Sequence, residues 1–283
     1  MSPIAALPAV ILEPIVRLAL HEDLYPVGDI TSAAALTVDT PLRAAIRSRE
    51  PGVIAGVDAA LLAAHLVDSA IEAKILCGDG AVVDGGETVL ELSGKAQALL
   101  AAERTMLNFI GHLSGIATLT RAYVQAVAAS RAKVTCTRKT TPGLRTLEKR
   151  AVQLGGGVNH RYSLSDAILI KDNHIAAAGG VHAALARARA AAGHMRVIEI
   201  EVDSLEQLRE ALPLEPHCVL LDNMSLEELR EAVSIGAGRV ILEASGNVQL
   251  SAVGAIAATG VDYISIGALT HSSRRLDVGL DAV

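Results

Sequence analysis

Arg138 and Lys139 stand side by side after a short apolar run, and they are the residues of this chain best suited to hold an anion. An arginine offers a planar fork of donors that matches a carboxylate, whereas a lysine offers a compact charge that suits a phosphate or a developing negative charge. Thr137 precedes them, and the turn 140–143 (Thr-Thr-Pro-Gly) adds hydroxyl and backbone N–H groups. The segment predicts an anion site; its other interpretation is a pair of surface cations that end a strand.

Further positive charge follows closely. The window 138–171 holds seven Lys or Arg and two acidic residues, so it carries a net charge of +5 in a chain whose net charge is −6. It includes His160 and Arg161, which follow three glycines at 155–157, and Lys171, which follows another apolar run. A cleft lined by one sign of charge concentrates ligands of the opposite sign. The window therefore favours a site for a small, multiply charged anion over an ordinary solvated surface.

Two carboxylates, Glu201 and Asp222, end the next two apolar runs or follow them directly. In a pocket that also contains lysine and arginine, these carboxylates have three possible roles. They can hold Mg²⁺, accept hydrogen bonds from sugar hydroxyls, or neutralise the basic groups in a structural ion pair. The residue types alone leave the three roles open.

Small residues follow the last two apolar runs. They are Ser245, Gly246 and Asn247, and then Gly267, Ala268 and Leu269. Backbone N–H groups at such positions commonly bind phosphate in α/β barrels, although the same residue types also form simple turns. The pattern predicts a phosphate site on the same edge of the sheet as the cations.

The elements that must position these residues are short runs rich in β-branched residues or leucine. The runs are 134–137, 167–170, 197–202, 218–221, 239–242 and 262–266, and helical patterns separate the later ones, as at 204–211 and 225–235. Buried strands that alternate with helices indicate a parallel sheet, and an α/β barrel gathers its active site at the carboxyl ends of its strands. Six runs, instead of the eight of a complete barrel, predict an incomplete α/β barrel.

The first part of the chain has a different pattern. Residues 11–23 predict an amphipathic helix, 42–50 a strand, and 80–92 a hairpin around Asp84-Gly85-Gly86. Residues 95–129 predict long helical structure with a break near 111–115. These patterns indicate a smaller α+β domain, followed by a barrel that begins near residue 115.

The composition excludes several functions. A net charge of −6 disfavours general nucleic-acid binding, and four Tyr, one Phe and no Trp leave few rings on which bases could stack. Cys77, Cys136 and Cys218 lack CxxC spacing, which argues against a disulfide framework or a zinc site and favours a reducing cytoplasm. The N-terminal stretch 1–14 has three prolines and no basic residue, so we expect neither a signal peptide nor a membrane span.

Together these motifs resemble one family. The runs are Thr-Arg-Lys-Thr-Thr-Pro-Gly-Leu-Arg (137–145), Gly-Gly-Gly-Val-Asn-His-Arg (155–161), Leu-Ile-Lys-Asp-Asn-His (169–174), Glu-Ile-Glu-Val-Asp (199–203) and Leu-Asp-Asn-Met (221–224). They are similar to the signatures of the quinolinate phosphoribosyltransferases, also called nicotinate-nucleotide pyrophosphorylases (carboxylating). Segments at 22–31, 103–108 and 262–271 fit as well, so the resemblance covers nearly the whole chain.

The resemblance implies a type II phosphoribosyltransferase with an N-terminal α/β sandwich at 1–114, joined by the C-terminal tail 271–283, and an incomplete α/β barrel at 115–270. It implies a cytoplasmic homodimer with shared active sites and leaves higher assembly open. The implied pentosyl transfer joins quinolinate to phosphoribosyl pyrophosphate (PRPP) in the presence of Mg²⁺. Its products are nicotinate mononucleotide, CO₂ and pyrophosphate, and it is a step of de novo NAD biosynthesis.

The resemblance also implies roles for single residues. The two carboxylates of quinolinate would bind Arg138, His160, Arg161 and Lys171, with Arg104 added from the neighbouring subunit. Lys139 would lie near the substrate and pyrophosphate, and Glu201 and Asp222 would bind ribose hydroxyls and Mg²⁺; these three form the catalytic set. The 5′-phosphate would bind Ser245, Gly246, Asn247, Gly267, Ala268 and Leu269, and Thr137 completes the substrate-binding residues.

One position departs from the family pattern, because Cys136 stands where an acidic residue is expected before the Thr-Arg-Lys run. If that acid orients Arg138 or Lys139 in relatives, the placement of these cations differs here, and we expect a modest effect on activity. A large gain in turnover on Cys136→Asp would show that the departure matters more than this.

Three other interpretations of the sequence stay open. A paralogous family linked to molybdenum transport shares the fold but differs in the loop after Thr-Arg-Lys, and assays with other pyridine or purine acceptors would separate it. A Schiff-base aldolase barrel would use Lys139 or Lys171, and borohydride would trap its carbonyl substrate. A non-catalytic anion-binding scaffold would bind PRPP without turnover.

Overall fold

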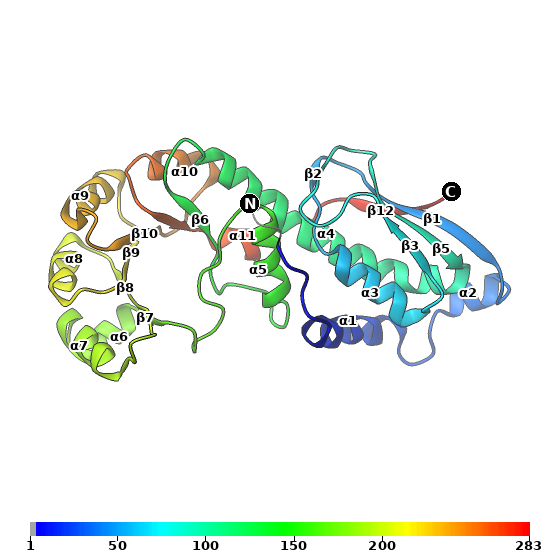
Figure 1. Ribbon diagram of the computed structural model, residues 1–283, viewed down its shortest axis with the longest axis horizontal. Coiled ribbons are helices and arrows are strands. Elements are labelled where there is room, and N and C mark those ends of the chain that lie inside the picture. The colour runs from blue at the N-terminus through cyan, green and yellow to red at the C-terminus, as the bar shows by residue number, and fades with distance from the viewer. Residues whose placement is uncertain (1–3) are drawn as a thin grey trace. The chain divides into compact units, whose positions relative to one another are not determined.

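The computed structural model describes residues 4–283, so the first three residues of the N-terminal stretch lie outside it. The described chain forms two compact units, each assembled from separate stretches of sequence (Figure 1). The first unit extends as far as Arg121 and includes 141–156 and 272–283, and the second comprises 122–140 and 157–271. The domain limits at 114 and 270 stay a prediction, because compactness alone does not define a domain. No helix in the described residues has the length and apolar character needed to cross a bilayer.

The first unit is built around an antiparallel sheet. Its strands are β1 (Pro41–Ser48), β3 (Glu72–Ile75), β5 (Thr88–Lys95) and β12 (Val278–Ala282), in the order β12-β1-β5-β3, and β2 (Gly52–Val53) pairs with β4 (Val82–Val83) separately. Its helices are α1 (Ala9–Leu24), α2 (Ile30–Ala35), α3 (Val57–Val67), most of α4 (Ala96–Ala126) and α5 (Arg145–Leu154). Strand β12 lies antiparallel to β1, so the last residues of the chain extend the first sheet.

Two predictions for this part of the chain are wrong. The segment 80–92 is not a hairpin, because β4 pairs with β2 whereas β5 pairs with β1 and β3. Helix α4 is not broken at its glycines but runs without interruption for 31 residues. A Cβ atom at Gly115 would lie 2.1 Å from the carbonyl oxygen of Arg274, and one at Gly111 would lie 3.0 Å from that of Leu276. These glycines therefore admit the C-terminal segment against the helix instead of ending it.

The second unit contains six parallel strands, and this prediction is confirmed. They are β6 (Lys133–Thr135), β7 (Ile168–Ile170), β8 (Ile198–Val202), β9 (Cys218–Asp222), β10 (Ile241–Ser245) and β11 (Tyr263–Ser265), in the order β6-β11-β10-β9-β8-β7. The helices are α6 (Asp172–Ala178), α7 (Val181–Ala191), α8 (Leu205–Ala211), the 3₁₀ turn η1 (Leu212–Leu214), α9 (Leu226–Gly236), α10 (Leu250–Ala257) and α11 (Ala268–His271). Helices α7, α8 and α9 line the outside of the strands (Figure 1). Within residues 4–283 no ladder joins β6 to β7, so the fold is an incomplete α/β barrel.

The strand sequences explain which side chains reach the inside of this barrel. In β8 (Ile-Glu-Ile-Glu-Val) the apolar residues alternate with Glu199 and Glu201, so the two glutamates share one face. The helices that follow β8 and β9 begin at capping serines. The Ser204 side chain accepts the backbone N–H of Gln207 at the start of α8, and Ser225 forms a capping box at the start of α9. Each of these strands therefore ends in a brief turn, and such turns hold the predicted site residues.

Candidate active site

A pocket of about 670 Å³ lies at the carboxyl ends of the parallel strands, and the second unit alone provides its lining. Of the predicted site residues, the pocket gathers Thr137, Arg138, Lys139, His160, Arg161, Lys171, Glu201, Asp222, Ser245, Gly246, Asn247, Gly267 and Ala268. Two predicted residues lie outside the lining. Leu269 is fully buried, with none of its surface exposed, and Arg104 is exposed on α4 in the first unit.

The positive charge of the window 138–171 divides between two places. Four of its cations line the pocket, and these are Arg138, Lys139, Arg161 and Lys171. The other three, Arg145, Lys149 and Arg150, belong to α5 in the first unit. There Arg150 Nη1 lies 2.6 Å from Asp79 Oδ2 and 3.2 Å from Asp58 Oδ2. A count of charge along the sequence could not separate a ligand site from this buried ion-pair network.

Two guanidinium groups face the pocket at close range. Arg161 Nη1 donates to the carbonyl oxygen of Ala167 at 2.9 Å, which fixes the side chain. Burial lowers the pKa of Arg161 and the charge of nearby Arg138 lowers it further, whereas Glu199 and Asp166 raise it. Because a guanidinium remains protonated at neutral pH, the two like charges repel each other. A bound anion would relieve that repulsion, so the site is arranged for a negatively charged ligand.

The two predicted carboxylates come from neighbouring strands. Lys171 Nζ forms an ion pair with Glu201 Oε2, and Asp222 Oδ2 accepts a hydrogen bond of 2.7 Å from Asn223 Nδ2. Both carboxylates line the pocket beside the cations. Carboxylate oxygens, together with phosphate oxygens of a substrate, are the ligands that Mg²⁺ prefers. The donor set fits a magnesium ion, with Lys171 as a competing partner of Glu201.

The loops after β10 and β11 bring backbone close to the pocket. Gly246 has φ +103°, and a Cβ atom there would lie 2.2 Å from Asn223 Oδ1, so this position requires glycine. A Cβ atom at Gly267 would lie 3.1 Å from Lys139 Cδ. Thr270 Oγ1 donates to the carbonyl oxygen of Lys139 at 2.7 Å and anchors that segment. Small residues thus leave backbone groups accessible on both loops, as a phosphate site needs.

Cys136, the departure from the family pattern, contacts the loop that carries His160. It is fully buried, and its Sγ donates to Asn159 Oδ1 at 3.3 Å. Asn159 Nδ2 in turn donates to the hydroxyl oxygen of Tyr162 at 3.1 Å. Cys136 therefore links the end of β6 to the loop of His160 and Arg161.

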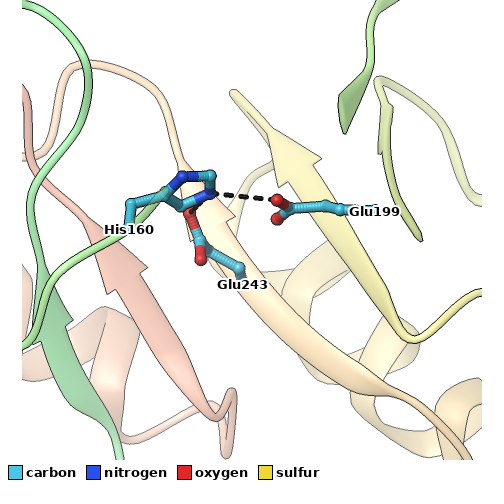
Figure 2. Close-up of side chains that lie close together, drawn as sticks. All are labelled: His160, Glu199 and Glu243. Atoms are coloured by element: carbon cyan, nitrogen blue, oxygen red, sulfur yellow. Dashed lines mark hydrogen bonds and ion pairs between the residues drawn. The ribbon is translucent and has the colours of Figure 1, made fainter. Parts of the chain in front are cut away.

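Two buried glutamates of the site, Glu199 and Glu243, had no role predicted from the sequence, and Glu243 lines the pocket. His160 Nε2 lies 2.9 Å from Glu199 Oε2 and 3.8 Å from Glu243 Oε1 (Figure 2). A signal was present, because Glu199 precedes Glu201 by two residues and Glu243 precedes Ser245 by two, which places each pair on one face of its strand. Further residues of the lining that were missed include Asn223, Gln249, Ser265 and His271.

Comparison with known proteins identifies relatives along the whole chain. The family model for the quinolinate phosphoribosyl transferase N-terminal domain matches residues 29–114, and that for the C-terminal domain matches 116–281. The nicotinate-nucleotide pyrophosphorylase [carboxylating] of Mycobacterium leprae is 50% identical over 271 residues, which cover 94% of this chain and 95% of that protein. The quinolinate phosphoribosyltransferase [decarboxylating] 1b of Nicotiana tabacum is 40% identical over 95% of this chain and 81% of that protein.

Solved structures agree with these relatives. The nicotinate-nucleotide pyrophosphorylase of Francisella tularensis superposes with a TM-score of 0.94 at 40% identity, and the match covers 100% of both chains. The Ehrlichia chaffeensis enzyme of the same name gives a TM-score of 0.92 at 41% identity, over 96% of this chain and 98% of that one. With both family models matched over almost all of the described residues, the chain belongs to the quinolinate phosphoribosyltransferase family.

Proposed function

We infer that the chain is a quinolinate phosphoribosyltransferase (decarboxylating), a pentosyltransferase of de novo NAD biosynthesis. It converts quinolinate and PRPP to nicotinate mononucleotide, CO₂ and pyrophosphate. One observation carries the inference beyond the family match: four Lys or Arg side chains, two histidines and three carboxylates line a single pocket at the ends of the parallel strands. Such a pocket suits a dianionic acid beside a sugar phosphate.

Quinolinate binds through its two neighbouring carboxylates. The paired guanidinium groups of Arg138 and Arg161 offer fork-shaped donors, and His160 and Lys171 lie in the same wall. Binding a dianion here removes the repulsion between the two arginines. Correct placement of the pyridine nitrogen against the sugar then turns a reaction between two molecules into one within a complex.

PRPP lies on the other side of the pocket. Glu201 and Asp222 accept hydrogen bonds from the ribose hydroxyls and, in our proposal, hold Mg²⁺. The ion supplies positive charge for the pyrophosphate of the bound substrate. The 5′-phosphate meets the backbone N–H groups of the loops 245–247 and 267–268, where small side chains leave room.

The transfer step needs no covalent enzyme intermediate. The pyridine nitrogen attacks C1 of the ribose while the bond from C1 to the pyrophosphate oxygen breaks, and Lys139 stabilises the charge that develops on the departing group. The nitrogen is then positively charged. Its charge stabilises the electron pair that stays on C2 when the bond to the C2 carboxylate breaks and CO₂ departs. A proton from solvent then adds to C2 and completes nicotinate mononucleotide.

We propose that the enzyme works as a cytoplasmic homodimer in which Arg104 of each subunit completes the pocket of the other. Arg104 is exposed on the surface of α4, where an arginine is free to meet another molecule.

The direct test measures nicotinate mononucleotide and CO₂ from quinolinate and PRPP, with and without Mg²⁺. We expect formation of both in equal amounts, dependence on the metal, and much slower reaction with nicotinate, which lacks the C2 carboxylate. Equal or faster transfer to nicotinate or to a purine acceptor would contradict the assignment. Binding of PRPP without any turnover would support the scaffold interpretation instead.

A further inference from the structure

His160, Glu199 and Glu243 form a cluster (Figure 2), and His160 and Glu243 line the pocket. Of the three, the proposed function uses only His160. Glu199 is on β8 two residues before Glu201, and Glu243 is on β10 two residues before Ser245. Side chains two residues apart on a strand share a face and lie roughly 6.6 Å apart along it. The two glutamates therefore form a layer just below Glu201 and Ser245, and of the two Glu243 lines the pocket.

The environment of this cluster disfavours charge. Glu199 exposes 6% of its surface and Glu243 exposes 4%, and among the described residues neither has a Lys or Arg at ion-pair distance. Oε1 of Glu243 is buried without a hydrogen-bond partner. Burial, with the charge of Glu199 as a second cause, raises the pKa of Glu243 to about 7. Two buried acids lower stability when hydrophobic residues could fill the same space, which favours a functional reason for their presence.

His160 is the polar group that both carboxylates face. Its Nε2 lies 2.9 Å from Glu199 Oε2 and 3.8 Å from Glu243 Oε1. On the other side of the ring, Nδ1 accepts the backbone N–H of Arg161 at 2.9 Å. A neutral imidazole that accepts at Nδ1 carries its proton on Nε2, from which it donates to Glu199. The contacts thus determine both the tautomer and the orientation of the ring.

A metal ion is the alternative occupant, since the three donor atoms all lie within 4.8 Å of one another. Such an ion would take the lone pair of Nε2. The lone pair of Nδ1 already accepts the N–H of Arg161, so the ring would have to lose its remaining proton. The hydrogen bonds of the cluster favour a proton at Nε2 over a metal.

We propose that Glu199 and Glu243 are positioning residues that act through His160 and set the wall of the pocket that receives a carboxylate of quinolinate. Glu199 holds Nε2 and so directs the ring. Glu243 lies on the second side of Nε2, and Nδ1 of the same ring accepts the backbone N–H of Arg161, so the cluster also places the segment that carries the Arg161 guanidinium. The substrate named here rests on the proposed function, and the cluster serves quinolinate binding and not PRPP binding.

Kinetics of the nearly isosteric variants Glu199→Gln and Glu243→Gln test the proposal. We expect KM for quinolinate to rise about tenfold in each, as loss of one charged hydrogen-bond partner implies, with kcat and KM for PRPP within about twofold. Glu231→Gln is the matched control, because Glu231 pairs with Arg209 at 2.6 Å on exposed helix surfaces. An unchanged KM for quinolinate, or equal increases for both substrates, would overturn the proposal.

A spectroscopic measurement on the free enzyme separates this proposal from the assignment of activity. In protein labelled with ¹⁵N-histidine, with His160→Gln used to identify the signals of His160, we expect the Nε2–H tautomer in the wild type and altered ring signals in Glu199→Gln. An Nδ1–H tautomer would overturn the proposal, as would a Zn²⁺-dependent shift of Nε2 that Glu243→Gln abolishes. If the wild type forms no nicotinate mononucleotide, the proposed function fails while this spectrum still tests the cluster.

Discussion

Substitution of two cations of the pocket, Lys139 and Arg161, tests the proposed site one residue at a time. Lys139→Ala and Arg161→Ala each remove a charge that the reaction uses, so we expect kcat/KM to fall by about 10²-fold or more. The Lys139 side chain is exposed, so its loss should leave the fold intact. Steady-state kinetics and circular dichroism measure the two outcomes.

Lys133→Ala is the matched control for these variants. Lys133 is exposed at the first residue of β6, whereas Lys139 follows the carboxyl end of the same strand. The same substitution there should keep near-normal activity. Near-normal turnover in Lys139→Ala or Arg161→Ala would refute the roles assigned to these residues.

The raised pKa of Glu243 leads to a prediction about how the free energy of unfolding depends on pH. Its pKa is about 7 in the folded protein against 4.5 for an ordinary glutamate, so the folded state binds more protons between these values. Stability therefore falls as the pH rises through this range. Glu243→Gln removes the buried charge, and we expect it to raise the free energy of unfolding by about 2 kcal/mol at pH 8 and by much less at pH 5.

Urea unfolding of the wild type and Glu243→Gln at the two pH values checks this prediction. A structural role for Glu243 gives the opposite result, because the variant would then be less stable than the wild type at both values. A gain in stability with a weaker affinity for quinolinate would show a residue retained for activity at the expense of the fold.

Sequence reasoning at this scale succeeds where a polar residue ends an apolar run or follows it. Arg138, Lys171 and Asp222 each come directly after an apolar run, and all three line the pocket. Glu199 lies inside the run 197–202, which was interpreted only as a buried strand, and Glu243 directly follows the run 239–242 but was given no role. Their role depends on which face of the strand is polar, and that becomes visible only when the register of neighbouring strands is known.

The turn between β10 and α10 provides a prediction at the scale of elements. Gly246→Ala would place a methyl group 2.2 Å from Asn223 Oδ1, and Asn223 Nδ2 donates to the proposed metal ligand Asp222. We expect KM for PRPP to rise about tenfold and the melting temperature to fall, because the two loops must move apart.

Gly179→Ala is the matched control for this turn. Gly179 also has a left-handed backbone, with φ +88°, but it ends α6 and an added Cβ atom meets nothing within 4 Å. It should lower the melting temperature through backbone strain alone and leave KM for PRPP unchanged. The same change in KM in both variants would mean that contact with Asn223 is irrelevant to the site.

Elements defined by local pattern were predictable, whereas elements defined by distant contacts were not. Most of the six parallel strands lie in short runs rich in apolar residues, helical patterns separate the later runs, and the sequence shows both. The glycines of α4 led to a false prediction of a helix break. Glycine is needed there because the C-terminal segment, which is distant in sequence, packs closely against the helix. Gly155 is similar: an added Cβ atom would lie 2.4 Å from the carbonyl oxygen of Ala117, so this glycine serves helix packing.

A prediction for the whole molecule concerns the shared site. Arg104→Ala removes the side chain that one subunit contributes to the pocket of the other. Lys171→Ala removes a side chain from the pocket of its own subunit. Each variant alone should be nearly inactive. After unfolding together and refolding in equal amounts, mixed dimers contain one intact site, so activity should return to about a quarter of the wild-type value. No recovery in a verified mixed dimer would refute the exchange of Arg104 between subunits.

The pairing of β12 with β1 has a consequence for how the protein is made. The two strands stand near opposite ends of the chain, and Arg49 Nη2 also meets Asp281 Oδ1 at 2.6 Å. During translation β1 emerges long before β12, so one border of that sheet stays open until residues 278–282 have left the ribosome. A nonsense codon just before β12 would therefore leave a product prone to aggregate, although every pocket residue had been synthesised.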